Sequence, residues 1–370
     1  MDQTGQERAV NSFFAAENEN KEGFFRKLGR FFAKLFLLIL ETVLLAAIVL
    51  YAAMFVLAKG PSPAMSRIFV TSVRETSAVG FLADLFFTPE EIAEIEAVKE
   101  AEEFAPTDTS LFTESTVLTI DGSDGSQPDE WGLVDEDGDG IIVVPVKGAG
   151  YAGYMMVVLD PSRVIVGSDP AMYYARGYTV EDFVDLFDAA AGTNAGGFYD
   201  PKGEGNGSIP DSTVVYKGEI YFPDNCIDGI AAIDGDHILH VAKSMTRQEL
   251  IDNDIRYAVC YGPVLISNGE PADPETLRYS LNPRTAIGQR SDKAMLLLVI
   301  DGRQASSMGA SFQDLIEIMQ SFGAVNAVNL DGGSSSAMWY QGDYINKTAS
   351  LIWIRPVPTS ILVLKEGAEG

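Results

Sequence analysis

The longest apolar stretch of the chain lies near its N-terminus, at residues 35–58. It contains 24 residues and one ionisable group, Glu41. A helix of that length crosses the ~30 Å hydrocarbon layer of a bilayer. Basic residues and no acid stand directly before it: Arg26, Lys27, Arg30 and Lys34. Because positive charge collects on the cytoplasmic side of membrane helices, we expect a cytoplasmic N-terminus and an extracellular remainder.

A cleaved signal peptide is the alternative interpretation of this stretch. Its apolar core is usually ~7–15 residues and precedes a small-residue cleavage site. The stretch here is longer, and no clear A-x-A site follows it. We therefore predict an uncleaved single-pass anchor at 35–58 in the cell membrane, preceded by a cytoplasmic tail at 1–34. Glu41 is unfavourable in lipid, and the sequence does not explain it.

The next segment, 59–110, reads as a stem or linker with one helix. Thr88 is a suitable N-cap, Pro89 suits the first helical position, and two acids fill the first turn. The apolar face of this helix, Ile92, Ile95 and Val98, is suited to packing on the following domain or on a second copy of the chain. The sequence leaves that choice, and the oligomeric state, open.

From residue 111 to 370 the pattern changes to short apolar runs. Those at 116–120, 141–146, 154–159 and 164–167 predict strands. Helical spacing predicts one helix that starts at Thr179 and ends at Gly192, and another at 311–322 that ends at Gly323. We expect an α+β fold, with a mixed, mostly antiparallel sheet core and a few packed helices. A Rossmann fold is disfavoured, because no G-x-G-x-x-G opens a helix after a strand.

Charge restricts the partners of this domain. The formal net charge is −27, which makes nucleic acid an improbable partner. An anionic substrate would have to be held by local arginines, whose planar guanidinium groups bind phosphate bidentately. Arg284, Arg303 and Arg355 are the candidates. For each of them, a surface ion pair is the alternative.

The sequence gives little reason to expect a metal or a cofactor. The two cysteines, Cys226 and Cys260, form no zinc motif, and we favour two buried thiols over a disulfide. The acidic run 135–140 resembles a calcium loop, but Val146 occupies the position that needs a bidentate Glu. An acidic hairpin turn is therefore expected there. The two histidines, His237 and His240, stand outside every polar cluster, which disfavours a Ser-His-Asp triad.

Four polar clusters follow apolar segments in this domain. They are T-N-A-G-G-F-Y-D at 193–200, N-P-R-T-A-I-G-Q at 282–289, D-G-R at 301–303 and N-L-D-G-G-S-S-S at 329–336. Glycines let a ligand or another backbone approach closely, and carboxylates with arginines suit glycosidic chemistry on an anionic substrate. A simple turn is the alternative for each cluster taken alone.

Together with G-P-V-L-I at 262–266, these motifs occur in an order that resembles the phosphodiester glycosidase family. The resemblance covers about 188–364. Members of the family remove a sugar from a phosphodiester, as in the release of N-acetylglucosamine from phosphodiester-linked mannose. Ser334 departs from the pattern, since many relatives have a third glycine there.

The residues and the resemblance together suggest roles for the site. Asp331 and Asp301 are the leading catalytic carboxylates, with a strand-turn role as the alternative for Asp301. Substrate binding is expected from arginines and a hydroxyl (Arg284, Arg303, Thr285), sugar-binding amides (Asn194, Asn329), close-approach glycines (Gly196, Gly197, Gly332, Gly333) and phosphate-binding serines (Ser334, Ser335). Asn329 is alternatively a residue that satisfies a strand end.

These features predict a membrane-anchored, outward-facing hydrolase that cleaves a sugar-1-phosphodiester linkage. The substrate would be a cell-envelope glycan, a polysaccharide such as an exopolysaccharide, or a glycoconjugate. The alternative is a non-catalytic envelope glycan-binding or exopolysaccharide-biosynthesis accessory protein that uses the same pocket. The sequence does not reveal the sugar, or whether the anomeric configuration is retained or inverted.

Overall fold

The computed structural model describes residues 3–76, 79–97, 104–113, 128–201, 205–222, 226, 228–350 and 354–368, and of 3–27 only the backbone. The chain divides into two compact units, Met1–Ser66 and Arg67–Gly370. The predicted strand at 116–120 and Val98 of the stem lie outside the described residues.

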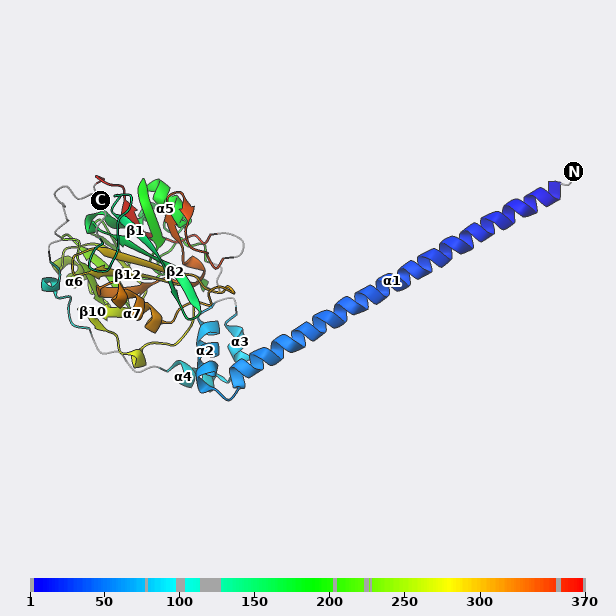
Figure 1. The fold of residues 1–370 in the computed structure, drawn as a ribbon, viewed down its shortest axis with the longest axis horizontal. Coiled ribbons are helices and arrows are strands. Elements are labelled where there is room, and N and C mark those ends of the chain that lie inside the picture. Colours follow the sequence, from blue (N-terminus) through cyan, green and yellow to red (C-terminus); the bar gives the residue numbers. More distant parts are fainter. Residues whose placement is uncertain are drawn as a thin grey trace. The chain divides into compact units, whose positions relative to one another are not determined.

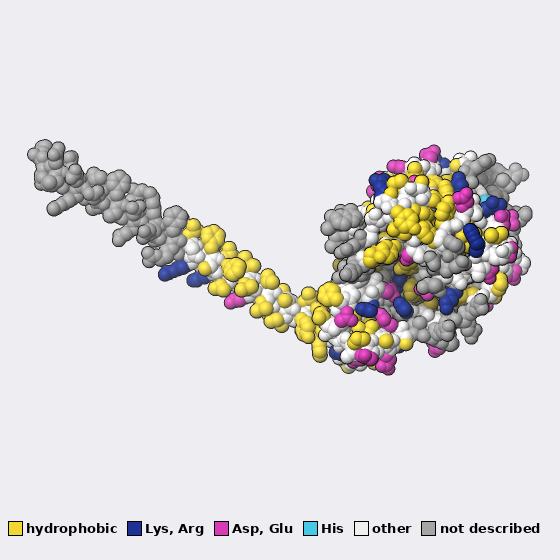
Figure 2. Space-filling model, turned by 180° about the vertical axis from the view of Figure 1, so that it is seen from behind, with side chains coloured by type: hydrophobic (Ala, Val, Ile, Leu, Met, Phe, Trp, Pro, Cys, Tyr) yellow, Lys and Arg dark blue, Asp and Glu magenta, His cyan; other side chains and the backbone are white. Residues whose placement is uncertain are grey.

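The first unit is dominated by one helix, α1 (Gln3–Lys59). Its part Leu28–Lys59 is long and apolar enough to cross a membrane, and none of its most apolar window is buried. Apolar side chains cover the surface of this part (Figure 2). A membrane anchor and an N-terminal signal sequence both meet this description.

The stem forms short helices: α2 (Pro63–Arg74), α3 (Phe81–Asp84) and α4 (Pro89–Glu96). The start of α4 confirms the predicted cap. The Thr88 side chain accepts a hydrogen bond from the Glu91 N–H, and the Glu91 carboxylate accepts one from the Thr88 N–H. Ile92 points inward and is 4% exposed.

A seven-stranded sheet forms the centre of the second unit. In spatial order its strands are β1 (Ile141–Gly148), β2 (Tyr151–Val158), β13 (Met295–Ile300), β12 (Arg284–Arg290), β14 (Ala324–Leu330), β10 (Val264–Ser267) and β11 (Glu270–Pro271). All of these neighbours pair antiparallel.

Two five-stranded antiparallel sheets complete the unit. One has the order β16 (Asp343–Tyr344), β15 (Met338–Tyr340), β4 (Ala189–Asn194), β17 (Thr359–Leu364) and β3 (Val164–Ser168). The other has the order β6 (Glu219–Tyr221), β5 (Val214–Tyr216), β9 (Ile255–Cys260), β7 (Ile230–Asp234) and β8 (Leu239–Ala242). The predicted α+β class is confirmed.

The central sheet is buried on both faces, which explains its continuous apolar runs. In β13, Met295, Leu297 and Val299 enter a core shared with the two smaller sheets. The alternate residues of β13 enter a second core with helix α7 (Phe312–Ser321), which lies against the opposite face (Figure 1). Helices α5 (Val180–Leu186) and α6 (Arg247–Asp252) are shorter.

The two predicted helices are confirmed at their starts, and one is wrong at its end. Ser311 caps α7, and Gly323 follows it with φ 80°. Thr179 caps α5, but this helix ends at Leu186 instead of Gly192. The chain turns and enters β4, where Gly192 pairs with Leu362 of β17. A Cβ on Gly192 would lie 2.8 Å from that leucine side chain, so packing in the sheet explains this glycine.

The expectation of two free thiols is wrong. Cys226 and Cys260 form a disulfide, with their Cα atoms 5.7 Å apart. The sheet brings Cys260, at the end of β9, to the loop that precedes β7, a proximity that sequence separation does not reveal.

The acidic run 135–140 is an irregular loop before β1. The carboxylates of Asp135, Asp137 and Asp139 lie within 4.8 Å of one another. Asp135 accepts hydrogen bonds from the Gly138 and Gly140 N–H groups, so its charge supports the loop backbone. Val146 lies in β1 and is 8% exposed.

Candidate active site

The ends of four strands bring the four polar clusters to one edge of the second unit. Arg284, the first residue of β12, pairs with Ile300 at the end of β13. Its neighbour Thr285 pairs with Leu330 at the end of β14. Asp301 and Asp331 each follow one of these strands, so they leave the sheet on the two sides of β12. The Asp331 N–H donates to the Ala195 carbonyl at 2.9 Å, which joins the end of β4 to the same place.

Asn194 is the hub that holds these strand ends together. Its Nδ2 donates to the Asp331 carbonyl at 2.5 Å. Its Oδ1 accepts from the Thr285 hydroxyl at 2.8 Å and from the Ala337 N–H at 3.1 Å. Asn194 and Thr285 are fully buried, with 0% exposure. Their side chains therefore position the Asp331 backbone, which differs from the expected contacts with a substrate.

The Asp331 carboxyl lies in an unusual environment. Burial raises its pKa from 3.8 to about 7, whereas the nearby Ser335 hydroxyl and the Arg355 guanidinium act in the opposite direction. The charge of Asp211 raises the pKa further. The Asp331 Oδ2 is buried without a hydrogen-bond partner among the described residues. A carboxyl that titrates near neutrality can exchange a proton during a reaction at physiological pH.

Other polar atoms of the same segment share this lack of partners. Within the described part of the chain, the Asn329 Oδ1 and the hydroxyls of Ser335 and Ser336 are buried without a well-formed hydrogen bond. The Asn329 Nδ2, by contrast, donates to the Gly262 carbonyl at 2.6 Å. Because buried polar atoms are nearly always paired, a cluster of unpaired ones next to Asp331 is typical of a site built for a polar ligand.

The arginines lie close to this cluster. Arg355 donates to the Ser334 hydroxyl at 3.1 Å, pairs with Asp200 and lies over the Phe198 ring. Arg303 is exposed, and its Nη2 lies 3.3 Å from the place of a Cβ on Gly333. Although the residue as a whole is exposed, partial desolvation of its guanidinium lowers the pKa of Arg303, and the charges of Arg284 and Arg355 lower it further. Three guanidinium groups thus act on one another at this edge.

Arg284 is 4% exposed, and its guanidinium already has partners within the protein. Its guanidinium stacks over the Phe312 ring at 4.0 Å and donates to the Ser280 hydroxyl at 2.7 Å. It also pairs with Glu75, which follows α2, at 3.2 Å. Ser280 and Asn282 donate to the two Glu75 oxygens, each at 2.7 Å. A carboxylate of the stem therefore lies where the sequence predicts a phosphate oxygen.

The adjacent residue of the stem contacts the second arginine. The Arg303 Nη2 donates to the Thr76 hydroxyl at 2.9 Å. The stem is fixed to the same loop by the Thr71 hydroxyl, which donates to the Tyr279 carbonyl at 2.6 Å, and by the Ser72 hydroxyl, which accepts from the Leu281 N–H at 3.0 Å. The sequence analysis missed these contacts, since nothing in the stem pattern points to the arginines.

Asp301 has a different environment from Asp331. It accepts hydrogen bonds from the Lys347 N–H at 2.8 Å and from the Asn346 amide at 3.4 Å. Burial raises its pKa, and these two donors lower it. Its carboxylate supports the 346–347 loop, which weakens the expectation that it acts on substrate.

The glycines of the last cluster permit a close backbone turn. Gly333 has φ 64°, a left-handed conformation that favours glycine, and it opens a 3-10 turn, Gly333–Ser335. A Cβ on Gly332 would lie 2.8 Å from the Pro283 carbonyl oxygen. The Gly196 N–H donates to the Thr359 hydroxyl at 3.0 Å. Gly332 is therefore glycine because the Pro283 backbone approaches closely, and Gly333 because of its left-handed conformation.

The sequence analysis also missed two side chains beside Gly197. A Cβ there would lie 2.9 Å from the Asp211 Oδ1 and 3.0 Å from the Tyr261 Cδ2. Gly197 itself was a predicted site residue, and its lack of a side chain was the available signal that other groups approach it.

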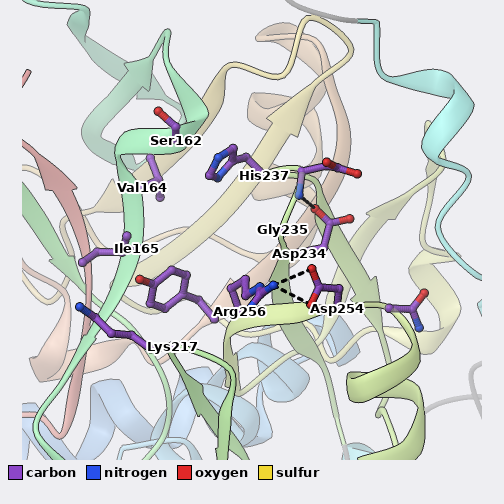
Figure 3. Close-up of a pocket in the computed structure, with 12 residues that line it drawn as sticks. Ser162, Val164, Ile165, Lys217, Asp234, Gly235, His237, Asp254 and Arg256 are labelled. Carbon is purple, nitrogen blue, oxygen red and sulfur yellow. Dashed lines mark hydrogen bonds and ion pairs between the residues drawn. The ribbon is translucent and has the colours of Figure 1, made fainter. Parts of the chain in front are cut away.

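A separate cavity of about 480 Å³ lies between β3 and the five-stranded sheet that contains β9 and β7 (Figure 3). The His237 ring projects into it, and Arg256 pairs with Asp254 on its wall. None of the residues that line this cavity is a predicted site residue. The other histidine, His240, pairs with Asp234 at 2.8 Å. The cavity is therefore distinct from the cluster at the strand ends.

Comparison with known proteins bears on this cluster. Residues 187–364 match the family model described as phosphodiester glycosidase, a range that contains all four motifs. This part of the chain belongs to the phosphodiester glycosidase family. A second finding supports the fold. The catalytic domain of zebrafish N-acetylglucosamine-1-phosphodiester alpha-N-acetylglucosaminidase, described as auto-inhibited by its pro-peptide, matches with a TM-score of 0.50 and 18% identity, over 61% of this chain and 82% of that one.

Two further matches are more distant or partial. An uncharacterized SPbeta prophage-derived protein of Bacillus subtilis, YomE, is 37% identical over 101 residues, which are 26% of this chain and 16% of that relative. The chain therefore spans a small part of the length of that relative. A hypothetical protein from Synechocystis matches with a TM-score of 0.42 and 14% identity, over 60% of this chain and 61% of that one. Membership of the phosphodiester glycosidase family indicates a glycosidase-type hydrolase.

Proposed function

We propose that this protein hydrolyses a sugar-1-phosphodiester linkage of a cell-envelope glycan, polysaccharide or glycoconjugate. The observation that carries the proposal is the buried Asp331 carboxyl, whose Oδ2 has no hydrogen-bond partner among the described residues. Burial raises its pKa to about 7, and Arg355 acts on it in the opposite direction. Arg355 and Arg284 also act on Arg303, so a cationic cluster lies at the same edge. An acid that titrates near neutral pH and a cationic cluster provide the two components that cleavage of a C–O–P linkage requires.

The arrangement suggests a separate role for the arginines and for Asp331. Arg303 and Arg355, with Arg284, hold the phosphate oxygens and stabilise the charge of the departing phosphate. The bond between the anomeric carbon and the bridging oxygen breaks, and the electron pair leaves with the phosphate. Asp331 acts at the anomeric centre, where it stabilises positive charge or accepts a proton from water. The unpaired Asn329 Oδ1 and the Ser335 and Ser336 hydroxyls are available to bind hydroxyl or phosphate oxygens.

The activity is testable with the full-length protein in detergent. Diesters of sugar-1-phosphates with several sugars are incubated with the protein, and released reducing sugar is measured. We expect turnover with at least one sugar, and turnover slower by roughly 10²-fold or more with Asp331→Asn. Binding of the diesters without turnover in the unaltered protein would support the non-catalytic glycan-binding function instead.

We also propose that α1 is an uncleaved anchor and that the second unit is extracellular. The basic residues before the span support this orientation, and the Cys226–Cys260 disulfide fits an oxidising compartment. Protease added to intact cells should remove the second unit and leave a tagged N-terminus protected. Release of a mature protein that begins after Ala58 would instead identify a signal peptide.

Glu75 supports a closed form of this site. Its carboxylate pairs with the Arg284 guanidinium, so it competes with a phosphate for the same donor. The zebrafish relative is described as auto-inhibited by its pro-peptide. We infer that the stem after α2 holds the site closed and that substrate access requires its displacement.

The closed form is tested with Glu75→Gln, which keeps the shape of the side chain and removes its charge. We expect kcat/KM for a sugar-1-phosphodiester to rise roughly tenfold, the effect of ~1.4 kcal/mol of lost competition. Glu94→Gln, an exposed position of α4, is the matched control. A fall in activity that parallels a fall in Tm would show that Glu75 only stabilises Arg284.

A further inference from the structure

Gly197 marks a point where three segments meet. Its N–H donates to the Cys260 carbonyl at 3.1 Å, and its carbonyl accepts from the Asp211 N–H at 3.4 Å. The Asp211 carboxylate and the Tyr261 ring both approach its Cα so closely that a Cβ would lie 2.9 and 3.0 Å from them. Any side chain at 197 would displace one of the two groups. The glycine therefore preserves a juxtaposition of a carboxylate and a phenol.

This juxtaposition adjoins Asp331. The Asp331 N–H is bonded to Ala195, two residues before Gly197, and the Gly262 N–H donates to the Asn329 carbonyl at 3.0 Å. The charge of Asp211 raises the pKa of Asp331. Burial raises the pKa of Tyr261, and the charge of Asp331 is the next cause. The groups that shift the pKa of the Asp331 carboxyl are thus the Ser335 hydroxyl, Arg355, Asp211 and the Gly332 N–H, and Asp331 in turn shifts the pKa of Tyr261.

Asp211 and Tyr261 are also accessible to a ligand. Asp211 is exposed, and among the described residues the side-chain donor to it is the Ser212 hydroxyl, which binds Oδ1 at 2.8 Å. Tyr261 is 41% exposed as a whole residue, although its hydroxyl is desolvated. Asp301, by contrast, is 7% exposed and is held by Lys347 and Asn346. An accessible carboxylate beside Asp331 is a better partner for it than a buried one committed to a loop.

We propose that Asp211, not Asp301, is the second catalytic carboxylate of the site, and that Tyr261 binds the substrate between Asp211 and Asp331. The inference rests on the proposed hydrolysis. In the chemical step, the oxygen of water bonds to the anomeric carbon and the proton of that water passes to Asp211. The bond from the anomeric carbon to the phosphate oxygen breaks, and its electron pair leaves on the phosphate, which the arginines hold.

The test uses Asp211→Asn and Tyr261→Phe in the full-length protein. Asp211→Asn should lower kcat by roughly 10²-fold or more, the range of acid–base groups. It should also move the Asp331 limb of the kcat/KM pH profile to lower pH, because a neighbouring negative charge is removed. Tyr261→Phe should lower kcat/KM by roughly tenfold with unchanged Tm. Asp185→Asn on α5 and Tyr174→Phe, both exposed, are the matched controls and should change neither quantity.

Three outcomes would overturn the inference independently of the proposed function. If the unaltered protein turns over a sugar-1-phosphodiester and Asp211→Asn keeps both its kcat and its pH profile, Asp211 is not the second carboxylate. If no diester is turned over, the titration of the Asp331 carboxyl carbon by ¹³C NMR still decides. Its pKa must fall in Asp211→Asn, and an unchanged pKa rejects the arrangement. A loss of activity with matching loss of Tm in Asp211→Asn and in Asp211→Glu would also reject it.

Discussion

Asp331 and Asp301 occupy similar positions in the sequence but lie in different environments in the structure. Each directly follows a buried strand, precedes a glycine and lies on one side of β12. The Asp301 carboxylate accepts two hydrogen bonds from the 346–347 loop, whereas the Asp331 Oδ2 has no partner among the described residues. The difference arises from segments distant in sequence, which supply donors to one carboxylate and leave the other open. Two similar motifs therefore separate into a structural acid and a candidate reacting acid.

Burial raises the pKa of both carboxyls, but the neighbouring groups that oppose this rise differ between them. Around Asp301 the Lys347 N–H and the Asn346 amide favour the charged form. Around Asp331 burial dominates, and its pKa reaches about 7. An unpaired, partly desolvated acid is unfavourable for folding, and such strain is found where function requires it.

The largest expected effect is on turnover by the two isosteric variants. Asp331→Asn should lower kcat by roughly 10²–10⁴-fold, because it removes a charge at the reacting centre and keeps the shape of the side chain. Asp301→Asn should leave kcat within about threefold, since its Oδ1 can still accept from Lys347. Initial rates with a sugar-1-phosphodiester measure both. Equal losses in the two variants would remove the distinction and restore Asp301 as a catalytic candidate.

The sequence predicted where the four polar clusters lie better than it predicted the contacts of their residues. The four motifs lie at strand ends because apolar runs, caps and glycines are local features that determine where strands stop. The roles of Asn194 and Thr285 depend on the pairing of β4 and β12 with β14, which only the sheet order fixes. Their side chains bind the backbone of the site instead of facing a substrate.

Other features could not be predicted for a related reason. The Cys226–Cys260 disulfide and the Glu75–Arg284 pair each join segments whose separation in sequence carries no information about distance. The end of α5 was misplaced because Gly192 serves packing between strands, and a glycine near a helical pattern also resembles a C-cap. Local sequence signals thus predict the helices and strands, whereas the contacts of the site residues depend on pairing between distant segments.

The Asp301 segment also carries Arg303, which is expected to bind the phosphate of the substrate. Arg303 is exposed and lies beside Gly333, so Arg303→Lys retains the charge and loses the bidentate geometry. We expect kcat/KM to fall roughly 10–100-fold, the value of one or two hydrogen bonds to a charged group. Arg256→Lys, at the separate cavity, should be nearly silent. Similar losses at both positions would indicate a general electrostatic effect. Arg284→Lys should lose stability as well, because Arg284 is buried over Phe312.

The last expected effect is on the pH dependence of stability and does not involve turnover. The pKa of Asp331 in the folded protein is about 7, above its ordinary value of 3.8. Between these values the folded state holds a proton that the unfolded state has released, so the contribution of Asp331 falls as pH rises from about 4 to 7 and is constant above. Asp331→Asn abolishes this titration. Relative to the unaltered protein, its free energy of unfolding should increase by a few kcal/mol between pH 4 and pH 8, as ~1.4 kcal/mol accompanies each pKa unit.

Denaturant unfolding of the two isosteric variants across this pH range measures the difference. Asp301→Asn should show the same sign and a smaller change, because the donors from Lys347 and Asn346 offset the burial of that carboxyl. A stability difference for Asp331→Asn that does not depend on pH would mean that its carboxyl is ionised throughout. In that case it would remain able to stabilise charge at the anomeric centre, but it would carry no proton at neutral pH.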